Sequence, residues 1–215
     1  MKTLLFIGLV MFFCPAVVFL GLLKRRWAYT SRVQVPLSHV AIDGEEIPIP
    51  LQGKVTEGKG WVLRNSKGQY TLTLDGLKAG SLERKTPALE IQGDLTLVLK
   101  KGTESELLSA DAALKKGAGT LTIRGEGSLR LQGETALEGE WKEETLNQDE
   151  PSALRIEGGK LVFTGEETAL YEDTVELAGG EIQIQCLNGK GTGIRAHTLD
   201  DRHFSGSLEM EESEE

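Results

Sequence analysis

The sequence predicts an all-β fold, a parallel β-helix, preceded by one apolar N-terminal segment. A phrase of two short strands joined by a glycine corner recurs at Ala88–Leu97, Ala153–Phe163 and Thr174–Ile184. The interval between the first and second copies is close to three times the interval between the second and third. Apolar and polar residues alternate inside each copy, as in strands with one buried face. A fixed period of this size is typical of a stacked solenoid.

Composition agrees with this fold and excludes two other classes of protein. The 26 glycines and the 6% aromatic content suit tight corners around a narrow aliphatic interior. The regular alternation and 39% hydrophobic content are unlike those of a disordered chain. Without Lys2 and the basic residues 24–26, which flank the apolar N-terminus, 20 basic residues face 33 acidic ones. Such a surface repels phosphates, so we expect no nucleic-acid partner.

The N-terminal run Thr3–Leu23 is uncharged and apolar. A helix of this length, rising about 1.5 Å per residue, spans a bilayer core of roughly 30 Å. Lys24, Arg25 and Arg26 follow directly, and the run lacks the small-residue pattern of a cleavage site. We therefore expect a transmembrane signal anchor (residues 1–23) in a lipid bilayer, with a cleaved signal peptide as the alternative. The positive-inside rule, taken alone, slightly favours a cytoplasmic domain.

The rest of the chain divides into three predicted segments. Residues 24–55 are expected to form a juxtamembrane spacer and an irregular cap, because Pro36, Pro48 and Pro50 interrupt their short alternating stretches. Residues 56–205 are expected to form the β-helix, and residues 206–215 a disordered acidic tail. A β-sandwich is the alternative, although it would favour longer strands and hairpin turns. The residues expected to face the core are Leu72/Leu74, Leu95/Leu97/Leu99, Leu121/Ile123, Leu129/Leu131, Leu154/Ile156, Leu161/Phe163, Val175/Leu177 and Ile182/Ile184/Cys186.

Two stretches hold the candidate ligand-binding residues. The acidic stretch Glu140–Pro151 lacks alternation, which predicts a loop inserted between coils. In this loop Trp141 either stacks on a sugar ring or anchors the loop to the coil. Tyr171, Glu172 and Asp173, near Glu166 and Glu167, form either an acidic, aromatic patch for a sugar or cation or a solvated turn.

Metal binding is not expected from the histidines. His197 and His203 lie in one short polar stretch, without the helix or cysteine pair that would support metal-ligand spacing. We interpret this stretch as a cap or a surface turn. The sequence therefore predicts no metal site and no cofactor.

Three phrases carry a resemblance to a known family: Gly58–Leu63, Gly68–Leu77 and Gly93–Thr103. They are similar to the Gly-x-Gly-Trp, Thr-Leu-Thr-Leu and Gly-Asp-Leu-Thr-Ile strands of bacterial right-handed parallel β-helix surface proteins of the carbohydrate-binding-domain type. The resemblance covers roughly residues 58–200. It implies a right-handed coil, an extracytoplasmic domain and a polysaccharide or another cell-surface ligand.

The chain departs from this family at one recurrent motif. Family members that bind acidic polysaccharide through calcium often place Asp-Gly-Ile after each coil. The corresponding positions here begin with threonine, at Thr135–Leu137, Thr168–Leu170 and Thr192–Ile194. Calcium requires six to eight oxygen ligands, so the missing carboxylates argue against a calcium-mediated site.

Together these observations predict a single-pass, membrane-anchored, non-catalytic domain that binds carbohydrate or another cell-surface ligand. The alternative is a structural scaffold, possibly cytoplasmic, that assembles through stacked coils. We expect no enzymatic activity, because none of the 33 acidic residues is singled out as a catalytic pair.

Overall fold

The computed structural model describes residues 34–141, 152–166, 168–188 and 191–212. These residues form nineteen strands and no helix, which confirms the all-β prediction. No helix in the described part is long and apolar enough to cross a bilayer. The predicted anchor, with Lys24, Arg25 and Arg26, lies outside the described residues and stays a prediction.

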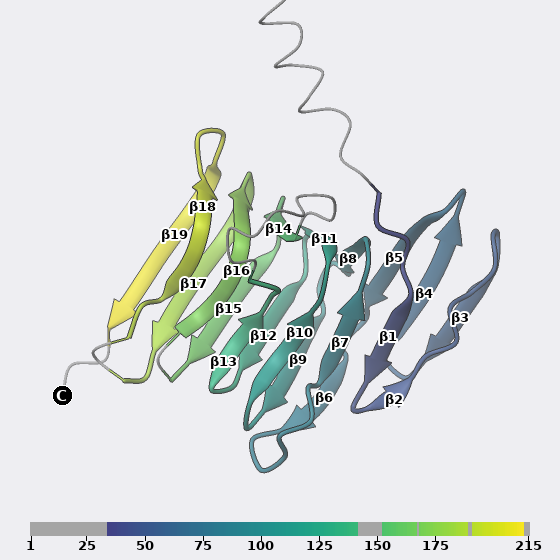
Figure 1. Ribbon diagram of the computed structural model, residues 1–215, viewed down its shortest axis with the longest axis horizontal. Helices are drawn as coiled ribbons and strands as arrows, with labels where there is room; N and C mark the ends of the chain where they lie inside the picture. The colour runs from purple at the N-terminus through teal and green to yellow at the C-terminus, as the bar shows by residue number, and fades with distance from the viewer. Residues whose placement is uncertain (1–33, 142–151, 167, 189–190, 213–215) are drawn as a thin grey trace, which may run out of the picture. The chain divides into compact units, whose positions relative to one another are not determined.

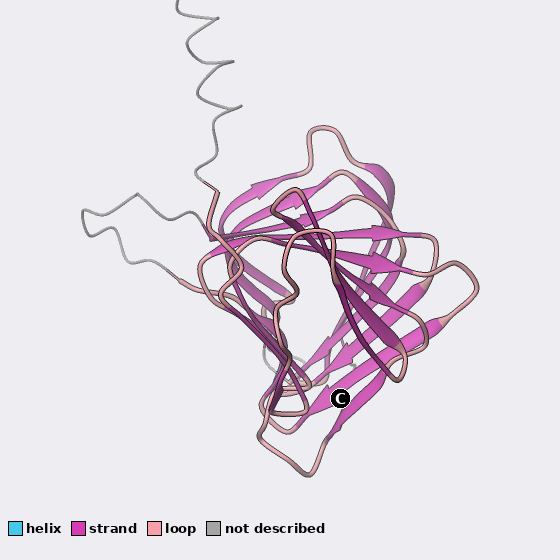
Figure 2. Ribbon diagram, turned by 90° about the vertical axis from the view of Figure 1, so that its right-hand side faces the viewer, coloured by secondary structure: helices cyan, strands magenta, loops and turns pink. Residues whose placement is uncertain are grey.

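From β5 onwards the strands stack on three faces of one solenoid, and neighbours within each stack run parallel (Figures 1 and 2). Face A contains β5 (Gln69–Leu74), β8 (Leu95–Leu99), β11 (Gly119–Gly125), β14 (Ser152–Ile156) and the second halves of β16 (Thr168–Leu177) and β18 (Ile194–Asp200). Face B contains β6 (Lys78–Ser81), β9 (Glu104–Ser109), β12 (Ser128–Gln132), β15 (Lys160–Gly165), β17 (Gly179–Cys186) and β19 (Ser205–Glu212). Face C contains β7 (Leu89–Gln92), β10 (Ala112–Lys116), β13 (Thr135–Glu138) and the first halves of β16 and β18. The right-handed winding stays a prediction.

The core consists of apolar rungs that repeat at one register position in successive coils. On face A, Leu72 pairs with Leu97, Leu97 with Ile123, and Ile123 with Ile156. All of these side chains are fully buried. Every residue that alternation predicted to face the core is buried in the structure. Each such side chain contributes about 1.5–3 kcal/mol on burial, so the rungs supply most of the stabilisation.

The prediction that the three copies of the phrase repeat at equal coil intervals was partly wrong. The second and third copies are in register with each other, as predicted. The first copy instead turns from face C to face A, because Leu95 is in register with Leu121, which is in register with Leu154. Two coils of unequal length therefore separate Leu95 from Leu154, rather than three of equal length. Glycine corners and alternation occur at every corner, so the phrase alone does not distinguish one corner from another.

The N-terminal cap is regular where the sequence suggested irregular structure. Strand β1 (His39–Ile42) forms a hairpin with β2 (Glu45–Glu46) and pairs antiparallel with β7. Strands β3 (Val55–Gly58) and β4 (Trp61–Ser66) continue antiparallel onto β5. Asp43 and Gly44 both have positive φ, as a two-residue hairpin turn requires. These hairpins close the N-terminal end of the core.

The disordered tail was predicted to begin at residue 206, which is too early in the chain. Residues 205–212 form β19, which pairs in parallel with β17. Leu208 and Met210 are in register with the core residues Ile182 and Ile184. The alternation of Leu208 and Met210 adds one more apolar rung to the core. We missed this alternation because the residues around it are mostly acidic.

Candidate functional site

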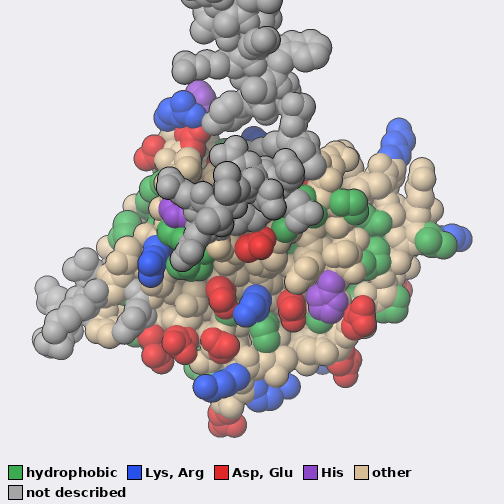
Figure 3. Space-filling view, in the orientation of Figure 1, with side chains coloured by type: hydrophobic (Ala, Val, Ile, Leu, Met, Phe, Trp, Pro, Cys, Tyr) green, Lys and Arg blue, Asp and Glu red, His purple; other side chains and the backbone are tan. Residues whose placement is uncertain are grey.

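Face C carries a row of outward-facing side chains that crosses the coils. Glu90, Lys115, Glu138, Tyr171 and Arg195 occupy one register position in β7, β10, β13, β16 and β18. The Lys115 ammonium lies 3.5 Å from the Glu138 carboxylate. Figure 3 shows acidic and basic side chains interleaved on the molecular surface in this view. Parallel stacking therefore brings together polar residues that are far apart in the sequence.

A groove of about 410 Å³ opens on this face. This volume falls within the usual range of small-ligand sites, roughly 300–1,000 Å³. The lining combines carboxylates, an amide, two lysines and two aromatic rings: Glu90, Gln92, Lys115, Lys116, Gly117, Glu138, Gly139, Glu140, Trp141 and Tyr171. The groove thus extends from β7, across β10 and β13, to β16.

Aromatic residues form one wall of the groove. The Trp141 ring stacks on Tyr171, with 5.0 Å between centroids and 24° between planes, and lies 3.7 Å from the His197 ring centroid. The Arg195 guanidinium carbon lies 5.4 Å from the Trp141 centroid and 5.5 Å from that of Tyr171. These contacts hold the Trp141 ring against side chains of β16 and β18. Its ring also lines the groove, so both interpretations remain compatible with its position.

A buried ion pair lies beneath the groove. The Lys116 ammonium lies 2.9 Å from the Glu172 carboxylate, and both side chains are at most 1% exposed. Lys116 also donates a hydrogen bond to the Ser152 hydroxyl (2.8 Å), which donates to Glu172 (2.7 Å). Burial lowers the pKa of the Lys116 ammonium, and the Glu172 carboxylate opposes this shift. The network ties together β10, β14 and β16.

Gly139 provides the space that this ion pair occupies. A Cβ at position 139 would overlap the Glu172 carboxylate. The Gly139 amide donates a 2.6 Å hydrogen bond to the Tyr171 carbonyl, so the backbone here also joins β13 to β16. Gly139 therefore serves both the groove lining and the buried pair.

A family model described as "Carbohydrate-binding domain-containing protein" matches residues 39–213. The chain belongs to this family. The matched range includes every strand from β1 to β19. No curated protein and no solved structure matches the chain. The suspected family resemblance is therefore confirmed at the level of the domain family.

The predicted site residues of this protein lie in three different places: the groove wall, a surface pair beside it, and the interior. Trp141 and Tyr171 come together in the groove wall. Asp173 is not part of the lining, since its carboxylate pairs with the His197 ring 2.7 Å away, next to Trp141. Glu172 was predicted as a surface ligand-binding residue, and this was wrong because its side chain is fully buried. Glu172 shares the inward parity of Leu170, and this pattern could have revealed its position.

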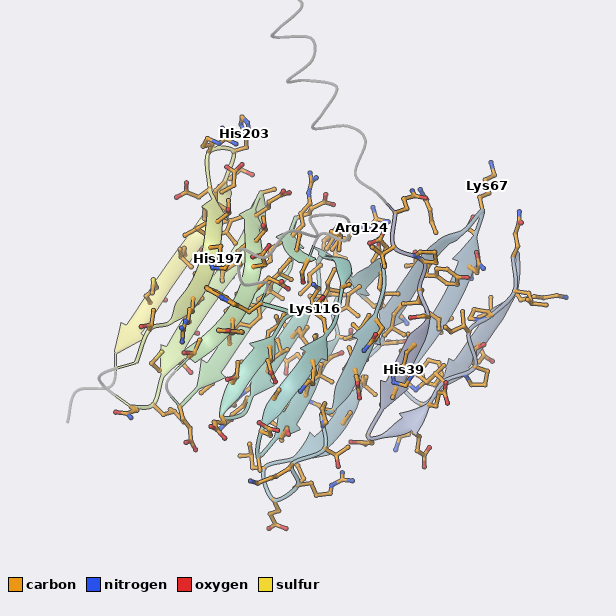
Figure 4. The ribbon with its side chains drawn as sticks, viewed as in Figure 1. His39, Lys67, Lys116, Arg124, His197 and His203 are labelled. Atoms are coloured by element: carbon orange, nitrogen blue, oxygen red, sulfur yellow. The ribbon has the colours of Figure 1, made fainter. Side chains whose placement is uncertain are left out.

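Sequence reasoning missed the groove residues contributed by earlier coils. Glu90, Gln92, Lys115 and Lys116 lie at least one coil before Trp141 and reach the groove only through strand register. In Figure 4, Lys116 lies between His39 on β1 and His197 on β18. Identifying these residues from sequence would have required the length of each coil.

The histidines do not form a metal centre in the described residues. His197 lies on β18, whereas His203 lies in the turn before β19, and Figure 4 shows the two apart. No group of three or more His, Cys, Asp or Glu side chains in the described ranges is arranged to hold a metal ion. His197 instead supports the Trp141 ring.

Proposed function

We propose that the protein binds carbohydrate, without catalysis, in the groove on face C. The observation that carries this proposal is the Trp141–Tyr171 wall beside a row of polar side chains. Aromatic rings pack against the apolar face of a pyranose, while carboxylates and amides accept hydrogen bonds from its hydroxyls. Membership of the carbohydrate-binding domain family supports the same assignment.

The geometry of the groove favours an extended ligand. From β7 to β16 the groove crosses three strand spacings, or about 14 Å at roughly 4.8 Å each. Glu90 and Gln92 line the β7 side, and Trp141 and Tyr171 line the opposite side. We propose that a short stretch of polysaccharide lies across the strands, parallel to the stacking direction.

Binding rather than hydrolysis fits the state of the carboxylates. Glycosidases raise the pKa of a catalytic acid by placing it in an apolar pocket. Here the buried carboxylate, Glu172, pairs with Lys116, and Glu138 pairs with Lys115 on the open groove wall. These two carboxylates are therefore engaged by lysine ammonium groups, unlike a catalytic acid placed in an apolar pocket.

We further propose that residues 1–23 anchor the domain in a membrane as a single-pass segment, with the β-solenoid on the extracytoplasmic side. The uncharged run Thr3–Leu23 and the basic residues Lys24–Arg26 support anchoring. The family resemblance supports the extracytoplasmic side. Protease accessibility of the domain on intact cells would test this topology, because protection from protease would contradict it.

Replacing Trp141 with Ala should weaken carbohydrate binding about tenfold. The variant loses the ring that lines the groove and releases Tyr171 from its stacked position. Removing a buried aromatic anchor from an interface commonly costs about 1–2 kcal/mol or more, which is about tenfold in affinity. Glycan-array screening of the full chain would identify a ligand, and calorimetric titration would then compare the two proteins.

Two further variants control this experiment. Trp141→Phe keeps a ring in the wall and should retain most of the affinity. Leu82→Ala removes an exposed apolar side chain from the turn after β6 and should bind like the wild-type chain. Equal binding by Trp141→Ala and the wild-type chain would exclude this groove as the carbohydrate site.

A specific observation favours a second function, assembly through the C-terminal end of the solenoid. Leu199, Leu208 and Met210 continue the core register of Val175, Ile182 and Ile184. They are nevertheless 39–57% exposed, because no further coil covers them in the described residues. A second copy could cover these rungs with its own identical end.

Light scattering of the full chain tests this assembly. If the end mediates association, the wild-type mass should rise with concentration, and Leu208→Glu should shift the protein towards the monomer. Since Leu208 is partly exposed, this substitution should leave the fold intact. Equal masses for the two proteins at every concentration would reject assembly through this end.

A further inference from the structure

We propose that the groove selects sugar units that carry a free amino group. This inference rests on the proposed function and specifies its ligand class. An aromatic wall, together with carboxylates that form no salt bridge within the described part of the chain, points to a cationic sugar.

Both lysines in the lining are already neutralised by carboxylates. The Lys115 ammonium lies 3.5 Å from Glu138, and the Lys116 ammonium lies 2.9 Å from Glu172 beneath the groove. The Lys116 ammonium is also hydrogen-bonded to Ser152. Neither lysine therefore offers an uncompensated positive charge to an anionic ligand.

Two other carboxylates in the lining form no ion pair with either lysine. Glu90 lies on β7 and Glu140 follows β13, on opposite sides of β10. Among the described residues, neither forms a salt bridge. Glu140 does act on the charge of Lys116, but that ammonium is already paired with Glu172. The groove therefore carries a net negative charge that a ligand ammonium would neutralise.

This arrangement predicts different affinities for cationic, neutral and anionic sugars. An ammonium group donates charge-assisted hydrogen bonds to Glu90 or Glu140, which are roughly twice as strong as neutral ones. A neutral sugar has only hydroxyls to donate, and a uronate carboxylate is repelled. The Trp141 and Tyr171 rings also attract cations, as the position of Arg195 shows. Arg195 itself is not part of the groove lining.

The test compares oligosaccharides of equal length on the full chain by calorimetric titration. The probes are a glucosamine oligomer, its fully N-acetylated form, a glucose oligomer and a galacturonate oligomer, at about pH 6, where amines are charged. We expect the glucosamine oligomer to bind at least fivefold more tightly than the other three. Added salt should reduce this preference.

Isosteric variants test whether the carboxylates of the groove cause the preference for an amino sugar. Glu90→Gln and Glu140→Gln should each lower the affinity for the glucosamine oligomer about threefold to fivefold. They should lower the affinity for the glucose oligomer less, because the glutamine amide oxygen still accepts hydrogen bonds from hydroxyls. Glu104→Gln, on face B, is the matched control and should have no effect. These variants keep the shape of the side chain, so misfolding is not expected.

The outcomes separate this inference from the proposed function. If a neutral or N-acetylated oligomer binds as tightly as the glucosamine oligomer and depends on Trp141, the amino-sugar inference is overturned and the groove remains a carbohydrate site. Preferential binding of the galacturonate oligomer also overturns it. If no oligosaccharide binds in a Trp141-dependent manner, both proposals fail.

Discussion

Replacing Lys116 with Met should lower the free energy of unfolding by about 3–5 kcal/mol. The substitution leaves the Glu172 carboxylate buried without its ammonium partner, 2.9 Å away in the wild-type chain. Removing one member of a buried ion pair has this cost because the remaining charge is desolvated and uncompensated. Urea unfolding of the full chain, followed by circular dichroism, measures the difference.

The neighbouring residue provides a matched control. Lys115 lies one position earlier on β10, is about half exposed and forms a surface ion pair with Glu138. Lys115→Met should therefore change the free energy of unfolding by less than about 1 kcal/mol. The double variant Lys116→Met/Glu172→Leu should recover most of the stability lost by Lys116→Met, since it removes both buried charges. Equal losses for Lys115→Met and Lys116→Met would contradict a buried, interacting pair.

The buried ion pair also fixes the register of the strands that form the groove floor. Lys116 on β10 and Glu172 on β16 belong to coils separated by β13, and Gly139 leaves the space between them open. A hydrophobic rung at this level would pack as well in energetic terms. The polar pair instead accepts only one register between these strands, because a shift by one residue would bury an unpaired charge. We infer that the pair keeps β10 and β16, which lie under the groove, in one register.

Local alternation was sufficient to predict the core from sequence. In a strand the side-chain period is two, so Leu121 and Ile123, or Leu161 and Phe163, must share a face whatever the rest of the chain does. The structure buries them as expected. The N-terminal hairpins had a local signal too, since Asp43–Gly44 is a favoured hairpin turn.

The groove could not be predicted in the same way, because it depends on coil length. On face C the rung runs through Leu89, Leu114, Leu137 and Leu170, and the intervals between these leucines are unequal. Any error in the coil lengths places Glu90 or Lys115 opposite the wrong neighbour. Trp141 and Tyr171 were recognised as candidates because aromatic residues are sparse, not because the sequence brings them together. The inward position of Glu172 was missed because charged residues are rarely fully buried.

Replacing Phe163 with Ala should also lower the free energy of unfolding by about 3–5 kcal/mol, through loss of packing rather than charge. Phe163 is fully buried on face B, in register with Leu131 in the preceding coil and Ile184 in the following one. Truncating a buried phenylalanine removes its transfer free energy and leaves a cavity that the neighbouring rungs only partly fill. The same urea unfolding experiment measures this loss.

The outward-facing neighbour of Phe163 shows why the effect should be specific to the core. Val162 lies on the same strand but faces away from the core, beside Arg130 and Gln183 of the adjacent coils. Val162→Ala should cost less than about 1 kcal/mol, since it opens no interior cavity. Each coil of a solenoid contacts mainly its neighbours, so the cavity should weaken the rungs from Leu131 to Ile184 more than the distant cap. Hydrogen exchange would show this as faster exchange of the β12, β15 and β17 amides, with the β1 and β4 amides little changed. Uniform acceleration across all strands would instead mean that the solenoid unfolds as one cooperative unit.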